Sequence, residues 1–170
     1  ADAVLRLCHR LSGGSAGIPA GSTTGSTGHV EVFTVGTRLT RITRAMRLHD
    51  PDRALAAAGE TVPDWSGGTR LGETLRVFLD RWGARGVARG AVVVVFSDGW
   101  ERGDPTLLGE QMARLHRIAH RVVWVNPHRG KAGYEPVQQG VLAALPHVDD
   151  FLAGHSLATF AELLEVVGRA

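Results

Sequence analysis

The 170-residue chain contains one cysteine, one lysine and one tyrosine, and its longest apolar run, at 91–96, is six residues long. Cys8 has no second cysteine to pair with, which excludes an internal disulfide. Six apolar residues are far fewer than the roughly 20 that a membrane-spanning helix needs. The sequence also shows no signal-peptide pattern. We therefore expect one domain in a reducing compartment, and we predict a cytoplasmic location.

The charge balance is close to even. Nineteen basic against 17 acidic residues give a formal net charge of +2, and every base except Lys131 is arginine. A nucleic-acid-binding surface needs basic residues clustered on one face, so the sequence predicts none. One local excess is formed by Arg38, Arg41, Arg44 and Arg47. This group is either a solvated edge or a docking surface for an acidic partner.

The first third of the chain predicts short helices and a hairpin. Residues 12–28 are almost entirely Gly, Ser, Thr and Ala, a composition that buries little apolar surface, so we expect a flexible loop there. Apolar spacing and turn residues around it indicate the regular elements. We expect a helix over 4–11, paired strands at 30–35 and 38–43, and a helix over 51–58 behind the N-cap Asp50.

The remaining chain alternates helices with buried strands. Residues 91–96 are apolar on both faces, as is typical of a central parallel strand covered by helices on each side. This alternation predicts an α/β fold: a doubly wound, mostly parallel sheet with helices on both faces, within one domain over 1–170. The expected helices are 69–82, 105–118, 141–145 and 157–167, and the expected strands are 91–96, 122–125 and 147–152.

Two polar segments occupy places where ligands bind in such sheets. One, at 97–100, follows the strand at 91–96, and the other, at 65–69, leads into a helix. A hydroxyl on a glycine-rich turn and a carboxylate at a strand end suit a hard cation such as Mg²⁺. The alternatives are that Thr69 is a helix N-cap and that Asp98 forms a turn.

Four sequence motifs, in order, resemble the von Willebrand factor A (VWA) domains of CoxE-like proteins: FTVGTRLT at 33–40, WSGGTRLG at 65–72, VFSDGW at 95–100 and WVNP at 124–127. In this family a metal-ion-dependent adhesion site (MIDAS) combines an Asp-x-Ser-x-Ser motif with a Thr and an Asp. The resemblance makes Thr69 and Asp98 metal ligands, whereas the Asp-x-Ser-x-Ser motif is missing. It thus implies an N-terminally truncated domain without its first strand, in which tight Mg²⁺ binding is not expected.

The resemblance also implies a non-catalytic accessory protein. Such proteins resemble partners of MoxR-type AAA+ ATPases in the maturation of carbon monoxide dehydrogenase or related molybdenum hydroxylases. Mg²⁺, or another divalent cation, would bridge the complete domain to a carboxylate of the partner. Predicted partner-contact residues are Trp65, Trp100, Arg38, Arg41 and Arg44, and predicted supporting residues of the site loops are Ser66, Gly67, Gly68, Ser97 and Gly99.

Two other functions fit the same architecture. A metal-assisted hydrolase would recruit Ser97 with a distant histidine, although Ser97 lacks the flanking glycines of a nucleophile elbow. A phosphate-binding loop is absent, because Lys131 is followed by Ala132. The other alternative is a scaffold that binds partners without metal. Loss of a central first strand further predicts a poorly soluble or loosely packed chain.

Overall fold

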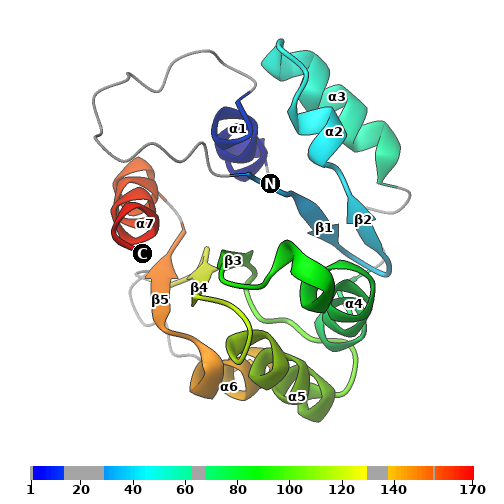
Figure 1. Cartoon of the computed structure of the whole chain (residues 1–170), viewed down its shortest axis with the longest axis vertical. Helices are drawn as coiled ribbons and strands as arrows, with labels where there is room; N and C mark the ends of the chain where they lie inside the picture. The colour runs from blue at the N-terminus through cyan, green and yellow to red at the C-terminus, as the bar shows by residue number, and fades with distance from the viewer. Residues whose placement is uncertain (1, 14–28, 63–67, 130–137, 155) are drawn as a thin grey trace. The chain divides into compact units, whose positions relative to one another are not determined.

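The computed structural model describes residues 2–13, 29–62, 68–129, 138–154 and 156–170 (Figure 1). The chain divides into two compact units, Ala1–Gly67 and Gly68–Ala170, called here the N-terminal and C-terminal units. Most of the predicted flexible loop lies outside the described residues, as do Trp65, Ser66 and Gly67. None of the described helices is long and apolar enough to cross a membrane.

The N-terminal unit combines a hairpin with three helices. Its strands pair antiparallel, with Thr34 opposite Thr40, which confirms the predicted hairpin. Asp50 is the N-cap as predicted: its Oδ1 accepts a 2.8 Å hydrogen bond from the Arg53 amide. The elements are α1 (Asp2–Leu11), β1 (Phe33–Val35), β2 (Leu39–Arg41), α2 (Thr43–Met46) and α3 (Pro51–Thr61).

The short helix α2 was not predicted. It begins at Thr43, within the segment expected to be a strand, and this residue is 4% exposed. The Thr43 hydroxyl oxygen accepts a 2.9 Å hydrogen bond from the Val32 amide. Ile42 and Met46, which flank this turn, are buried in the unit's apolar core. Burial of these side chains therefore ends the strand earlier than its alternating pattern suggests.

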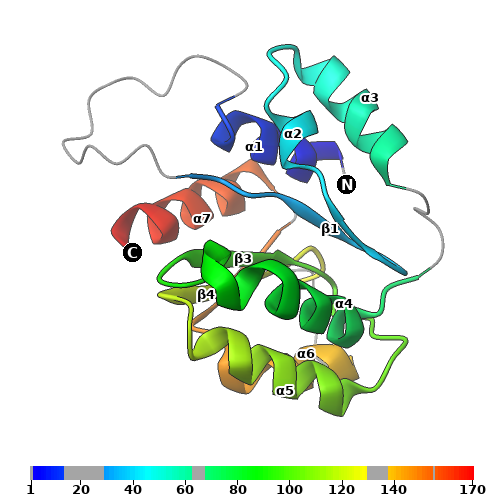
Figure 2. The same ribbon diagram turned by 45° about the vertical axis from the view of Figure 1, so that its right-hand side comes forward.

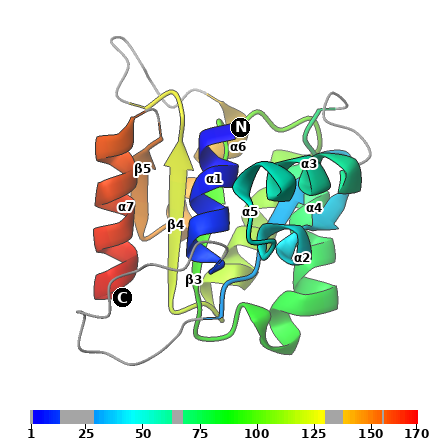
Figure 3. The same ribbon diagram turned by 90° about the horizontal axis from the view of Figure 1, so that it is seen from above.

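The C-terminal unit confirms the predicted α/β fold. Its three strands are parallel in the order β3-β4-β5, with Val95 opposite Trp124 and Trp124 opposite Phe151. Helix α7 lies on the opposite face of this sheet from α5 and α6 (Figures 1 and 2) and runs alongside β5 (Figure 3). The elements are α4 (Leu71–Phe78), the π-helix η1 (Leu79–Val87), β3 (Val92–Phe96), α5 (Pro105–His116), β4 (Arg121–Asn126), α6 (Gln139–Ala144), the 3₁₀ turn η2 (Leu145–His147), β5 (Asp150–Ala153) and α7 (Leu157–Arg169).

Two expectations for this unit need correction. Among the described strands, β4 is central and buried from Val122 onward, whereas β3 is an edge strand whose residues are all half-buried. An apolar run indicates that side chains are buried, but it does not determine which strands are its neighbours or whether the strand is central in the sheet. The helix expected to close at Gly83 instead continues past it as η1, and its helical dihedrals are interrupted at Gly86, which has a φ of +146°.

Candidate functional site

The loop that leaves β3 is held by its own side chains. The Gly99 amide donates to Ser97 Oγ at 3.0 Å, and the Trp100 amide donates to Asp98 Oδ1 at 3.0 Å. Gly99 has a φ of +80°, and a Cβ there would lie 2.1 Å from Cγ2 of Val141. Only glycine therefore fits this turn, where the loop meets α6. Asp98 forms a turn, and its other carboxylate oxygen faces the imidazole of His128 at 3.9 Å.

Asn126 ties the carboxyl ends of the strands together. Its side chain is fully buried, and its Nδ2 donates to the carbonyl oxygen of Asp98 at 3.3 Å. Its Oδ1 accepts from the His128 amide at 2.8 Å, and its carbonyl accepts from the Gly154 amide at 3.0 Å. The sequence placed Asn126 only at a strand end. Its role as a bridge between three strand ends depends on neighbours that are distant in the chain.

The Thr69 loop is attached to the Asp98 loop. Helix α4 begins at Leu71 without a side-chain cap, so Thr69 is not its N-cap. Instead, the carboxylate of Glu101 accepts from the Gly72 amide at 2.9 Å, within the first turn of α4. The carbonyl oxygen of Thr69 accepts from the Arg102 amide at 3.0 Å. The loops that carry the two predicted metal ligands therefore lie together at the carboxyl edge of the sheet.

Arg102 and Gly68 fit closely within this attachment. Gly68 has a φ of +81°, and a Cβ there would lie 2.6 Å from Cδ of Arg102. A larger residue would thus displace the Arg102 side chain and strain the backbone. Sequence reasoning missed Glu101 and Arg102, although both follow the singled-out motif at 95–100 directly.

The remaining predicted residues differ in their surroundings. Trp100 is 68% exposed beside Asp98. The Ser97 hydroxyl oxygen accepts a hydrogen bond from the Gly99 amide. Arg38 and Arg44 are exposed in the N-terminal unit. Arg41 instead holds Glu31, donating through Nε at 2.8 Å and through the guanidinium terminus at 2.6 Å.

These contacts change the acidity of Glu31. Its side chain is only 8% exposed, and burial alone would raise the carboxyl pKa. Hydrogen bonds from Arg41, Thr43 and His29 outweigh that effect and lower the pKa from 4.5 to about 2. Arg41 therefore has a structural partner within its own unit, which distinguishes it from Arg38 and Arg44.

The residues present do not complete a Mg²⁺ site. Such an ion requires about six oxygen ligands in near-octahedral arrangement. Asp98 supplies one carboxylate, of which one oxygen already accepts the Trp100 amide, and Thr69 supplies one hydroxyl. Within the described ranges, no three His, Cys, Asp or Glu side chains cluster in a way that could hold a metal. The described part of the chain thus offers, in Asp98 and Thr69, two of the roughly six ligands that a Mg²⁺ ion requires.

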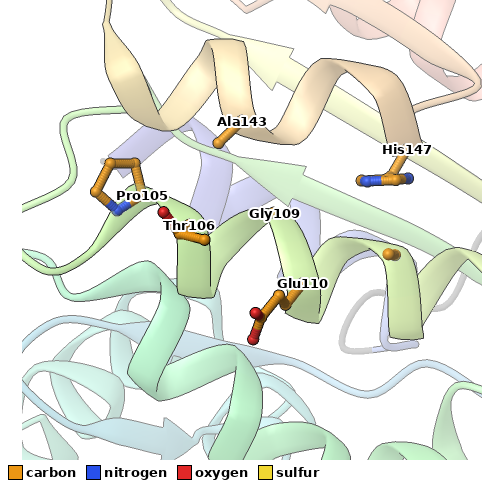
Figure 4. A pocket seen from close by; sticks show the side chains of 7 residues that line it. Pro105, Thr106, Gly109, Glu110, Ala143 and His147 are labelled. Atoms are coloured by element: carbon orange, nitrogen blue, oxygen red, sulfur yellow. The ribbon is translucent and has the colours of Figure 1, made fainter.

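A shallow apolar hollow of about 520 Å³ lies between α5 and the α6–η2 segment (Figure 4). Pro105, Thr106, Gly109 and Glu110 of α5 line one side of it, and Ala143 and His147 of the α6–η2 segment line the other. Neither Thr69 nor Asp98 lines it. The hollow is therefore separate from the loops that carry the predicted ligands.

The fold and its loops define a parallel α/β domain with ligand-type residues beyond the strand ends. The family model described as "VWA domain containing CoxE-like protein" matches residues 17–160, which is most of the chain. The chain belongs to this family, as its motifs predicted. Searches of curated proteins and of solved structures give no match.

Proposed function

We propose that this chain is a non-catalytic protein-interaction module that works with a MoxR-type AAA+ ATPase in the maturation of carbon monoxide dehydrogenase or a related molybdenum hydroxylase. Membership of the CoxE-like VWA family supports the accessory role. The proposed contact face consists of the Thr69 loop and the Asp98 loop. The observation that carries the proposal is the 3.0 Å bond from the Arg102 amide to the Thr69 carbonyl, which joins these loops.

Rigid support makes this face suitable for recognition. Asp98 is fixed by the buried Asn126 amide on its backbone and by the Trp100 amide on its carboxylate. A preorganised loop loses little conformational freedom when a partner binds. Trp100 adds a large exposed ring beside that carboxylate, and tryptophan is enriched at the centres of protein interfaces.

We propose Thr69 and Asp98 as two ligands of a divalent cation, Mg²⁺ or another, in the complete adhesion site of the family. The other ligands are not among the residues described here. Because two oxygens cannot hold Mg²⁺ tightly, partner binding by this chain depends chiefly on its own side chains. Arg38 and Arg44 are proposed as further contacts to an acidic surface of the partner.

The test is binding of the chain to a purified MoxR-type ATPase, followed by biolayer interferometry with Mg²⁺ and with EDTA. Asp98→Asn and Trp100→Ala are expected to weaken binding about tenfold each, as is usual for central interface residues. Glu162→Gln and Leu164→Ala, which alter exposed residues of α7, serve as matched controls and should bind like wild type. Equal affinity of all five proteins would refute the proposed contact face.

A further inference from the structure

A second charged surface lies at the opposite end of the strands from Thr69 and Asp98. Two loops meet there: the loop between η1 and β3, and the loop between α5 and β4. The Gly90 amide donates to the Ile118 carbonyl at 2.9 Å, and the His120 amide donates to the Ala91 carbonyl at 2.9 Å. These bonds bring the starts of β3 and β4 to one edge of the sheet (Figure 3).

Basic side chains collect on these paired loops. Arg89 and His120 extend from the bonded segments, Arg117 follows α5, and Arg85 lies in the last turn of η1. The Nε of Arg89 donates to the Ala84 carbonyl at 2.7 Å, which places its side chain along the end of η1. All four side chains are exposed. We call Arg85, Arg89, Arg117 and His120 the basic edge.

The carboxylates near the basic edge already have partners. Asp80 pairs with Arg114 at 2.9 Å, and Asp150 accepts both Nε and a terminal nitrogen of Arg121, at 2.5 and 3.0 Å. Asp149 accepts from the Val122 amide at 2.7 Å and contacts His116 at 3.1 Å. By contrast, no described carboxylate forms an ion pair with Arg85, Arg89 or Arg117. The edge therefore carries three uncompensated positive charges.

Helix ends explain only part of this arrangement. Arg85 and Arg117 lie at the C-terminal ends of η1 and α5, where a cation interacts favourably with the helix dipole. One cation at each end would serve that purpose, and α5 already carries Arg114 and His116 in its last turn. Arg89 lies beyond the end of η1, in the loop. The cluster thus exceeds what stabilisation of the two helices requires.

We propose that the basic edge binds a short acidic segment of a partner protein. Guanidinium groups recognise carboxylates through paired hydrogen bonds, and three of the four members of the edge are arginines. The positively charged surface is small, because Asp150 begins the neighbouring strand β5 and Asp149 directly precedes it. A duplex-binding surface usually contacts about 6–10 phosphates. Trp82, the nearest aromatic residue in η1, is half-buried under Arg81, so the edge lacks an open ring on which bases could stack.

The experiment uses the full chain and a fluorescein-labelled peptide of eight glutamates, followed by fluorescence anisotropy at low and moderate salt. The triple variant Arg85→Gln/Arg89→Gln/Arg117→Gln is expected to weaken peptide binding by about tenfold or more. The matched control Arg10→Gln/Arg53→Gln/Arg76→Gln removes the same charge from exposed arginines elsewhere. The control variant should bind the peptide with wild-type affinity. Rising salt should weaken peptide binding by the wild type and by the control variant, which both retain the basic edge.

Several outcomes would overturn the proposal: no binding of the peptide by wild type, an equal loss in the two triple variants, or tighter binding of duplex DNA than of the peptide. Thermal melts by circular dichroism check that both triple variants fold. Should the edge variant unfold, the single variant Arg117→Gln is compared with Arg76→Gln, and about a threefold difference is expected. Equal affinity of those two single variants would then refute the proposal.

Discussion

The side-chain amide of Asn126 donates a 3.3 Å hydrogen bond to the backbone carbonyl of Asp98. Through this bond the buried end of β4 holds the exposed loop that follows β3. The Oδ1 of Asn126 also accepts a hydrogen bond from the His128 amide. One side chain thus satisfies a carbonyl in the loop after β3 and an amide in the loop after β4. The geometry of the proposed contact face therefore depends on a residue that itself has no exposed surface.

Replacement of Asn126 by alanine should destabilise the C-terminal unit. It leaves the Asp98 carbonyl and the His128 amide without their partner, and an unsatisfied buried polar group costs about 1–3 kcal/mol. Urea unfolding followed by tryptophan fluorescence measures the change. Gln139→Ala, at an exposed position of α6, is the control and should stay within about 0.5 kcal/mol of wild type. An Asn126→Ala protein as stable as this control would contradict the bridging role.

Substitution of Gly99 by alanine tests the turn that presents Asp98. The added Cβ would meet the Val141 side chain, and the positive φ is unfavourable for alanine, so we expect a loss of about 1–3 kcal/mol. Gly168→Ala is the matched control, since a Cβ there meets nothing within 4 Å. Its free energy of unfolding should differ little from that of wild type. Indistinguishable unfolding curves for the two variants would show that the turn adapts freely.

The regular elements of the C-terminal unit could be predicted because their patterns are local. The apolar run at 91–96 predicts a buried strand, and the spacing of apolar residues after Pro105 predicts a helix. Both predictions need only residues that are close in sequence. The continuation of η1 past Gly83 was missed, because a glycine inside a helix looks the same in sequence as one that ends a helix. Helix α2 was missed for a similar reason: the buried bonds of Thr43 are invisible in an alternating pattern.

The candidate site could be predicted only in part. Its loops follow strand ends, and the motifs place Asp98 and Thr69 on them. The bonds that join those loops come from Arg102, Glu101 and Asn126, whose partners lie far away in the chain. The basic edge could not be predicted at all. Arg89 and Arg117 are separated in sequence by a strand and a helix, and backbone hydrogen bonds between their loops bring those loops together.

The hydrogen bonds on Glu31 predict how the stability of the N-terminal unit varies with pH. The folded pKa of about 2 lies below the ordinary 4.5, so the folded unit favours the ionised carboxylate. Its stabilisation is fully present above about pH 4.5 and is lost as the pH falls toward 2. Glu31→Gln should remove that contribution, of about 1–3 kcal/mol at neutral pH.

Urea unfolding of both proteins by circular dichroism, repeated between pH 2 and 7, measures this effect. The stability difference between wild type and Glu31→Gln should be largest at neutral pH and should shrink as the pH falls through the window from 4.5 to 2. Glu60→Gln, at an exposed position of α3, is the control and should show no such change. A difference that stays constant across the whole pH range would mean that Glu31 stabilises the unit by packing, because only its charged form holds Arg41 as an ion pair.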